Sequence, residues 1–207
     1  MRSRIAYAIV LLACAVLPAS AQDRMPPISA DRLTDEQQKA IDEFRAARSA
    51  EITGPFVALL RSPEVLSRAR AMGDYVRYRS ALPPRLSEFV ILITARGWTQ
   101  NYEWNAHRPL AERAGVSPAV ITAIAEGRRP GGMTEDEDIL YTFCDELLRS
   151  RSVSDPTYAR AVARFGERGV IDTIGIVGYY TMIAMVLNTA RTPLPPGAAP
   201  ALKPLPR

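Results

Sequence analysis

The sequence is poor in the residues that carry thiol and redox chemistry. Among 207 residues there are only two cysteines, Cys14 and Cys144, and a single histidine. If the first 21 residues are removed, as argued below, Cys144 is the only cysteine left. An intramolecular disulfide and a CxxC redox pair are then both excluded. Cys144 lies in the apolar stretch ILYTFCDELL, which indicates a buried thiol rather than a reactive one.

Lysine is also scarce, and no run of like charges occurs. Lys39 and Lys203 are the only lysines among 26 basic residues, and the 24 arginines are spread along the chain. The formal net charge of +4 falls to +2 when Arg2 and Arg4 are removed. We interpret most arginines as solvated surface residues, and we expect no nucleic-acid partner.

Strand-like alternation is nearly absent, whereas helix boundaries recur. Thr34-x-x-Gln37 and Thr134-x-x-Glu137 have the form of capping boxes, and Ser62-Pro63 and Ser117-Pro118 place a cap residue before proline. The sequence therefore predicts an all-α fold, a compact helical bundle. Helices are expected over residues 34–48, 55–61, 63–81, 84–96, 100–114, 118–126, 134–149, 156–166 and 168–189.

The first 21 residues have the form of a secretory signal peptide. Arg2 and Arg4 precede an apolar stretch over 5–17, and Ala19-Ser20-Ala21 fits a cleavage site. A periplasmic or secreted protein starting at residue 22 is expected. The alternative, lipidation of Cys14, fits less well, because a leucine precedes the small residue and the apolar run continues past the cysteine.

The mature chain is expected to form one domain with two short flanks. Residues 22–33 resemble a linker, 34–192 the all-α domain, and 193–207 a proline-rich tail that is extended and either loose or laid over a neighbouring subunit. Residues 173–190 carry no charge and reach the lower length limit of a membrane span. Their glycines and threonines favour a helix in a core or subunit interface instead, so no span is expected after signal cleavage.

The single histidine lies near two glutamates. Glu88 falls in an apolar helix, so its carboxylate must be paired, protonated or hydrogen-bonded. Gln100, Glu103 and His107 share one face of the next helix, for which Thr99 is a plausible cap. If the helices fold back on each other, Glu88 reaches that face and forms a Glu, Glu and His cluster.

Three interpretations of this cluster stay open from spacing alone. In a pocket walled by Tyr102, Trp98 or Trp104, the pKa values of the cluster would be pushed apart, as acid and base catalysis requires. A structural salt bridge that includes His107 is the simpler reading and is favoured by the spacing. A metal site is less expected, because one histidine and two carboxylates fall short of the usual ligand sets.

At these residues the chain resembles the carboxymuconolactone decarboxylase family, which includes the alkylhydroperoxidase D type proteins. The resemblance is carried by EFVILITARGWTQNYEWNAHRPLAERAGVSPAVITAI and by VIDTIGIVGYYTMIAMVLNTARTPLP. In the peroxidase branch a glutamate precedes a CxxC pair and a histidine. Here Glu88 and His107 match the outer residues, while Gln100 and Glu103 occupy the cysteine positions, so thiol peroxidase activity is not carried over.

The resemblance implies an oligomeric all-α lyase, often a trimer or hexamer, that needs no organic cofactor. The implied reaction is decarboxylation of a small unsaturated lactone, with isomerisation or hydrolysis as relatives. The predicted export argues against the usual pathway enzyme, because soluble aromatic catabolism supplies that lactone in the cytoplasm. The implied catalytic residues are Glu103 as acid or base, His107 as proton shuttle and Glu88 as its orienter. The candidate substrate-binding residues are Arg96 as a carboxylate clamp, or else a surface arginine, with Gln100, Tyr102 and Trp104.

Two hypotheses follow from the sequence and the resemblance together. The first is an exported, cofactor-independent enzyme acting on a small lactone or an aromatic-derived acid, and it predicts a closed pocket with perturbed carboxylates. The second is a non-catalytic binding or scaffold oligomer, in which Glu88, Glu103 and His107 saturate one another and no cavity lies beside them. Metal-assisted chemistry at the same cluster would require a bound ion.

Overall fold

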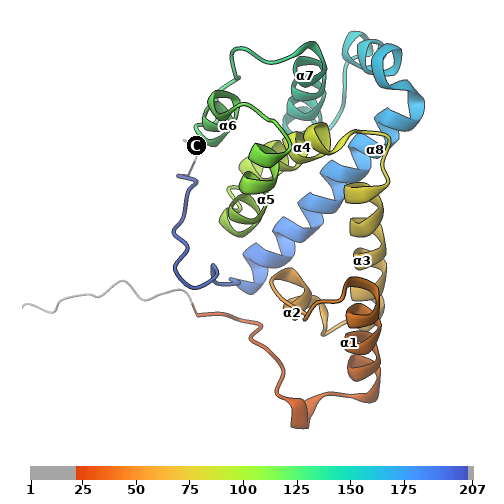
Figure 1. The fold of residues 1–207 in the computed structure, drawn as a ribbon, viewed down its shortest axis with the longest axis vertical. Coiled ribbons are helices and arrows are strands. Elements are labelled where there is room, and N and C mark those ends of the chain that lie inside the picture. Colours follow the sequence, from red (N-terminus) through yellow and green to blue (C-terminus); the bar gives the residue numbers. More distant parts are fainter. Residues whose placement is uncertain (1–21, 205–207) are drawn as a thin grey trace, which may run out of the picture.

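The structure is a computed structural model that describes residues 22–204. The predicted signal peptide, with Cys14 and the cleavage site, lies outside the described residues. Within the described range the chain forms eight α-helices, one short 3-10 helix and no strand (Figure 1). In chain order these are η1 (Ala30–Arg32), α1 (Asp35–Arg48), α2 (Pro55–Leu59), α3 (Pro63–Tyr78), α4 (Pro84–Gly97), α5 (Asn101–Arg113), α6 (Pro118–Ala125), α7 (Glu135–Ser150) and α8 (Asp155–Ala190).

The predicted helices are confirmed. Thr34 and Thr134 form the two expected capping boxes, with both reciprocal hydrogen bonds present. Ser62 and Ser117 occupy N-cap positions without a side-chain cap, and each is followed by proline in the first turn. The last two expected helices both lie within the 36-residue span α8, where the non-helical Gly166, with φ 68° and ψ 170°, separates them at a kink.

Helix α4 is the centre of the bundle. It packs against α5, α7 and α8, and every residue from Leu86 to Arg96 is buried. Because α4 is enclosed on all sides, its sequence is apolar nearly all round, as expected for a core helix. Burying one large aliphatic side chain contributes about 1.5–3 kcal/mol, so this helix supplies much of the apolar stabilisation. The polar groups between Leu86 and Arg96, Glu88 included, therefore face protein rather than solvent.

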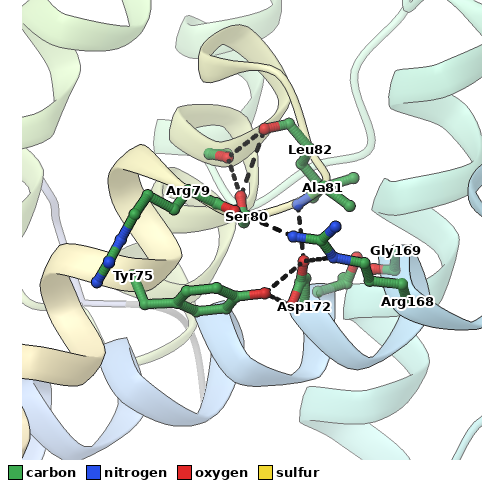
Figure 2. A network of polar contacts seen from close by, with 10 residues as sticks. Tyr75, Arg79, Ser80, Ala81, Leu82, Arg168, Gly169 and Asp172 are labelled. Carbon is green, nitrogen blue, oxygen red and sulfur yellow. Dashed lines mark hydrogen bonds and ion pairs between the residues drawn. The ribbon is translucent and has the colours of Figure 1, made fainter.

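The long helix α8 crosses the bundle diagonally beneath α4 (Figure 1). Among residues 22–204 it alone is long and apolar enough to cross a membrane, and 56% of its most apolar window is buried within the protein. A polar network ties it to the end of α3 (Figure 2). The buried carboxylate of Asp172 accepts hydrogen bonds from the Tyr75 hydroxyl at 3.0 Å and from the Ala81 amide at 2.7 Å. These contacts are those of a core helix.

The described part of the proline-rich tail, residues 193–204, lies on its own chain, whereas a loose tail or one laid over a neighbour was expected. The Leu202 side chain is buried, and its amide donates to Asn101 Oδ1 at 2.8 Å. The carbonyls of Ala199 and Lys203 accept from Asn105 and Arg96 at 3.0 and 2.8 Å. Prolines leave neighbouring carbonyls without local amide partners, so side chains of α4 and α5 satisfy them.

The expected linker over 22–33 is likewise held against the domain. Its Arg24 amide donates to the carbonyl of Ala190, at the end of α8, at 2.8 Å. The Arg61 guanidinium donates to the carbonyl of Pro26 at 2.7 Å. The two flanks of the domain are therefore fixed at separate places on one helical body (Figure 1).

Candidate active site

The turn between α4 and α5 sets the geometry of the site. Thr99, the expected cap, adopts a left-handed conformation with φ 48°, and Gln100 takes the N-cap position instead. The Gln100 side chain accepts from the Tyr102 amide at 2.6 Å and donates to Asn188 Oδ1 at 2.8 Å. The oxygen and the nitrogen of the Gln100 side-chain amide are thus both hydrogen-bonded. Of the three polar residues expected to share one helix face, only Glu103 and His107 remain available.

The fold-back places the predicted Glu88 and His107 together. Their side chains meet across α4 and α5, with 2.7 Å between Glu88 Oε2 and His107 Nδ1. Both residues are buried, and the ring of Tyr180 lies edge-on to the imidazole with centroids 4.9 Å apart. The contact fixes the orientation of the imidazole, while Nε2 has no hydrogen-bond partner within residues 22–204. Glu88, and not Glu103 one turn away, is therefore the partner of His107.

Glu103 is the unusual member of the group. It is 3% exposed, and neither carboxyl oxygen has a hydrogen-bond partner in the described part of the chain. Burial raises the pKa of this carboxyl to about 9, because the charged form loses its hydration without gaining a partner. At neutral pH Glu103 is therefore a neutral carboxylic acid with a proton to donate.

A cavity of about 290 Å³ opens beside these groups. It lies between α5 and α8 on one side and α1, the α1–α2 loop and α3 on the other. The volume is near the lower end of small-molecule sites, which suits a ligand with one ring. Its polar lining includes Arg48, Arg77, Tyr102, Glu103, His107 and Tyr180. Burial raises the pKa of both Tyr102 and Tyr180, so these phenols stay protonated as possible hydrogen-bond donors.

The other three predicted binding residues do not reach this cavity. Arg96 is buried, contacts the tail, and borders two other hollows of about 280 and 510 Å³. Trp104 is 1% exposed and packs in the core, and Gln100 serves as the helix cap. Neighbouring helix positions point about 100° apart, so Trp104 cannot share the direction of Glu103. Arg96 is accordingly neither a surface residue nor a clamp for this cavity.

Three polar residues that line the cavity were not predicted from the sequence. Arg48, Arg77 and Tyr180 come from α1, α3 and α8, which are remote from the α4–α5 hairpin in sequence. Tyr179 and Tyr180 are the only polar aromatic pair in the uncharged run 173–190, and this was the one available signal. The two arginines resemble all the others along helical faces, so only the fold distinguishes them.

The described residues provide neither a reactive thiol nor a set of several metal ligands at this cavity. Cys144 is fully buried on α7, where burial raises the pKa of its thiol far above the usual range. Among the described residues no three side chains of His, Cys, Asp or Glu gather closely enough to hold an ion. Glu103 is not hydrogen-bonded to the Glu88–His107 pair. The three-residue cluster predicted from the sequence is therefore a pair and a separate carboxyl group.

The helices superpose on solved structures described as having an alkylhydroperoxidase AhpD core, which confirms the resemblance at the level of fold. No protein-family model matches the chain, and no curated protein matches its sequence. An uncharacterized peroxidase-related protein from Ralstonia eutropha JMP134, with an alkylhydroperoxidase AhpD core, superposes with a TM-score of 0.67. The two are 15% identical, over 84% of this chain and 92% of that one.

Two further solved structures are similar over nearly their whole length. A peroxidase-related protein from Silicibacter sp. TM1040 gives a TM-score of 0.65 at 16% identity, over 83% of this chain and 91% of that one. A cysteine-to-alanine variant of the debrominase Bmp8, in complex with 2,3,4-tribromopyrrole, also gives 0.65, at 11% identity, over 86% and 94% of the two chains. At these identities the similarity establishes the fold and leaves the reaction to the site itself.

Proposed function

We propose that this protein is an exported, cofactor-independent enzyme in which Glu103 is the general acid. Its substrate would be a small unsaturated lactone or an aromatic-derived carboxylic acid, and the reaction a decarboxylation, isomerisation or hydrolysis. One observation carries the proposal: Glu103 is a buried carboxylic acid, without a partner within residues 22–204, that lines a cavity beside the Glu88–His107 pair. A carboxyl group kept protonated at neutral pH is suited to proton donation.

In a decarboxylation, the bond between the substrate carbon and its carboxylate would break, and the electron pair would pass into the unsaturated ring as a dienolate. Glu103 would donate its proton to the carbanionic carbon, and carbon dioxide would leave. The resulting Glu103 carboxylate would be reprotonated from solvent or through His107. In an isomerisation, His107 would remove a proton from one carbon and Glu103 would donate its own proton to another, after which the proton on His107 would pass to the Glu103 carboxylate and restore both groups.

His107 and Glu88 would act as a unit. The 2.7 Å contact orients the imidazole, so that Nε2 is the nitrogen left for proton transfer. Glu88 does not line the cavity and would act through His107, as a positioning residue. Tyr102 and Tyr180 would donate hydrogen bonds to a developing enolate oxygen.

The alternative is a non-catalytic scaffold or binding oligomer with the family fold. That hypothesis requires Glu88, Glu103 and His107 to saturate one another with no cavity beside them. Glu103 instead has no partner within residues 22–204, and a cavity of about 290 Å³ adjoins it. An unpaired buried polar group costs about 1–3 kcal/mol, which a purely structural network has no reason to retain. Both observations favour the enzyme.

The debrominase with this fold was solved with a small halogenated pyrrole. In that structure an alanine replaces a cysteine, whereas the only cysteine within residues 22–204 of this chain is buried on α7. A planar single ring also suits the cavity beside Glu103 in size. The comparison supports a ring-shaped ligand, and the chemistry we propose uses carboxyl and imidazole groups instead of a thiol.

We also propose a homo-oligomer, a trimer or hexamer as the resemblance implies. Support comes from an apolar groove between α3 and α8, lined in part by Val65, Met72 and Met182. Val65 and Met72 are more than 40% exposed, as are Ile171 and Ile174 nearby on α8. Exposed apolar clusters of this kind mark association surfaces. Light scattering on the wild type and on Met72→Arg would test it, with a loss of mass in the variant expected.

The central experiment screens the purified protein for turnover of unsaturated lactones and aromatic acids, beside Glu103→Gln and a surface control, Glu126→Gln. Glutamine keeps the shape of Glu103 and removes its proton, so we expect a rate loss of about 100-fold or more. The control should keep the wild-type rate. A Glu103→Gln protein that turns substrate over at the wild-type rate would exclude Glu103 as the general acid, and an unreactive wild type favours the binding protein.

A further inference from the structure

Arg77 is a cation in the cavity that has no counter-ion among residues 22–204. It lies on the last turn of α3 and lines the same space as Glu103 and His107. Its Nε is buried and has no hydrogen-bond partner among the described residues. The guanidinium carbon lies 5.0 Å from the centroid of the Tyr78 ring, and this aromatic contact does not neutralise its charge.

The acid best placed to pair with Arg77 is already engaged. Asp74 precedes it by three residues, a spacing at which helical side chains meet. One Asp74 oxygen is 2.8 Å from Arg48, and the other is 2.8 Å from Arg70. With both carboxylate oxygens occupied from other directions, Asp74 leaves Arg77 without a partner in the described part of the chain.

The other charged groups around the cavity are also committed. Arg48 is held by Asp74 and lies over the rings of Phe44 and Phe56, 5.2 and 4.7 Å from their centroids. Glu51, which also lines the cavity, pairs with Arg45 at 2.7 Å. Glu103 keeps its proton and so supplies no negative charge. The lining therefore presents one uncommitted positive charge and no uncommitted negative one.

We infer that Arg77 anchors the carboxylate of a small, singly charged acid, whose ring lies in the cavity against Glu103 and His107. A guanidinium offers parallel N–H donors that match a carboxylate, and a partly buried one gains most from such a partner. A single uncommitted cation and a volume of about 290 Å³ select a one-ring monocarboxylate. This role belongs to Arg77 rather than to Arg96, the arginine suggested by the sequence.

The inference rests on the proposed function for the fate of the bound acid, but binding can be measured without turnover. Calorimetric titration of the purified protein would compare benzoate with benzamide, a neutral molecule of nearly the same shape. We expect benzoate to bind at least tenfold more tightly, since hydrogen bonds to charged groups contribute more than neutral ones. Equal affinity in the wild type would by itself overturn the inference.

Three variants locate the effect. Arg77→Met keeps the apolar stem and removes the charge, so its preference for benzoate should fall to about onefold, with circular dichroism confirming the fold. Arg77→Lys should keep part of the preference, because a point charge remains without the planar donor pair. Arg79→Met removes an exposed cation two residues away and should keep the full preference. A preference retained in Arg77→Met, or lost equally in Arg79→Met, rules Arg77 out as the anchor.

Failure of the anchor and failure of the proposed reaction give different results. Glu103→Gln should still prefer benzoate through Arg77 while losing turnover. If benzoate binding depends on Arg77 but no substrate turns over, the role of Arg77 as the anchor is supported and the proposed reaction is contradicted. If turnover depends on Glu103 while benzoate is bound no better than benzamide, only the role of Arg77 as the anchor is contradicted.

Discussion

Gly54 lies directly against the phenol of Tyr102. A β-carbon built on Gly54 would be 2.7 Å from the Tyr102 hydroxyl oxygen and 2.9 Å from the ring, closer than such atoms approach. Gly54 has φ 58° and forms the N-cap of α2, between Thr53 and Pro55, which line the same cavity as Tyr102. The absence of a side chain at this position therefore allows Tyr102 to take its place in the cavity wall.

Gly54→Ala should displace Tyr102 and weaken ligand binding. The left-handed backbone alone costs an alanine about 1–2 kcal/mol, and the contact with Tyr102 adds to this. Two alanine variants serve as controls for thermal unfolding and benzoate affinity. Gly166→Ala shares the positive φ but has open space around it, and Gly131→Ala has open space and no positive φ. We expect the loss of stability to be smallest for Gly131→Ala, larger for Gly166→Ala and largest for Gly54→Ala. Benzoate affinity should be reduced only for Gly54→Ala. Unchanged affinity would remove Tyr102 from the binding wall.

The raised pKa of Glu103 predicts a specific dependence of stability on pH. The carboxyl has a pKa near its ordinary value of 4.5 when unfolded and about 9 when folded. Between these values the unfolded state has released the proton that the folded state retains. The free energy of unfolding should therefore fall as pH rises through this window, by up to about 1.4 kcal/mol per pH unit.

Glu103→Gln tests this pH effect, because glutamine cannot ionise. The difference in unfolding free energy between the variant and the wild type should grow in favour of the variant from pH 5 to pH 8. Denaturant titrations at the two pH values measure it. Glu126→Gln, at an exposed position on the surface, should follow the wild type at both. Parallel pH curves for Glu103→Gln and the wild type would show that Glu103 ionises normally in the fold.

Local signals in the sequence predicted the helices, whereas the full cavity depended on tertiary packing. Both capping boxes formed because Thr34 and Thr134 act only on residues of the next turn. Glu88 and His107 could be paired in advance because a short turn joins their helices. Arg77 could not, since nothing near it in the sequence tells which α3 face meets α5. The direction of Arg96, which does not line this cavity, could not be predicted because α4 is apolar nearly all round.

The Glu88–His107 contact should show strong energetic coupling. His107→Ala leaves the buried Glu88 carboxyl group without its hydrogen-bond partner, which costs about 1–3 kcal/mol. Glu88→Gln should cost less, because glutamine can still hydrogen-bond the ring. In a double-mutant cycle the combined Glu88→Gln, His107→Ala variant should be more stable than the sum of the single losses predicts. Additive losses in denaturant unfolding would mean that the two side chains do not stabilise each other.

The C-terminal tail should contribute to stability within a single subunit. Leu202 is 4% exposed and is the one tail residue in the apolar core among those described, so Leu202→Ala should cost about 2–3 kcal/mol. Leu194, only half-buried at the start of the tail, provides a matched control whose alanine variant should lose clearly less. Because Leu202 packs on its own chain, the midpoint shift for Leu202→Ala should not change with protein concentration. A shift that grows on dilution would instead mean that the tail stabilises contacts between subunits.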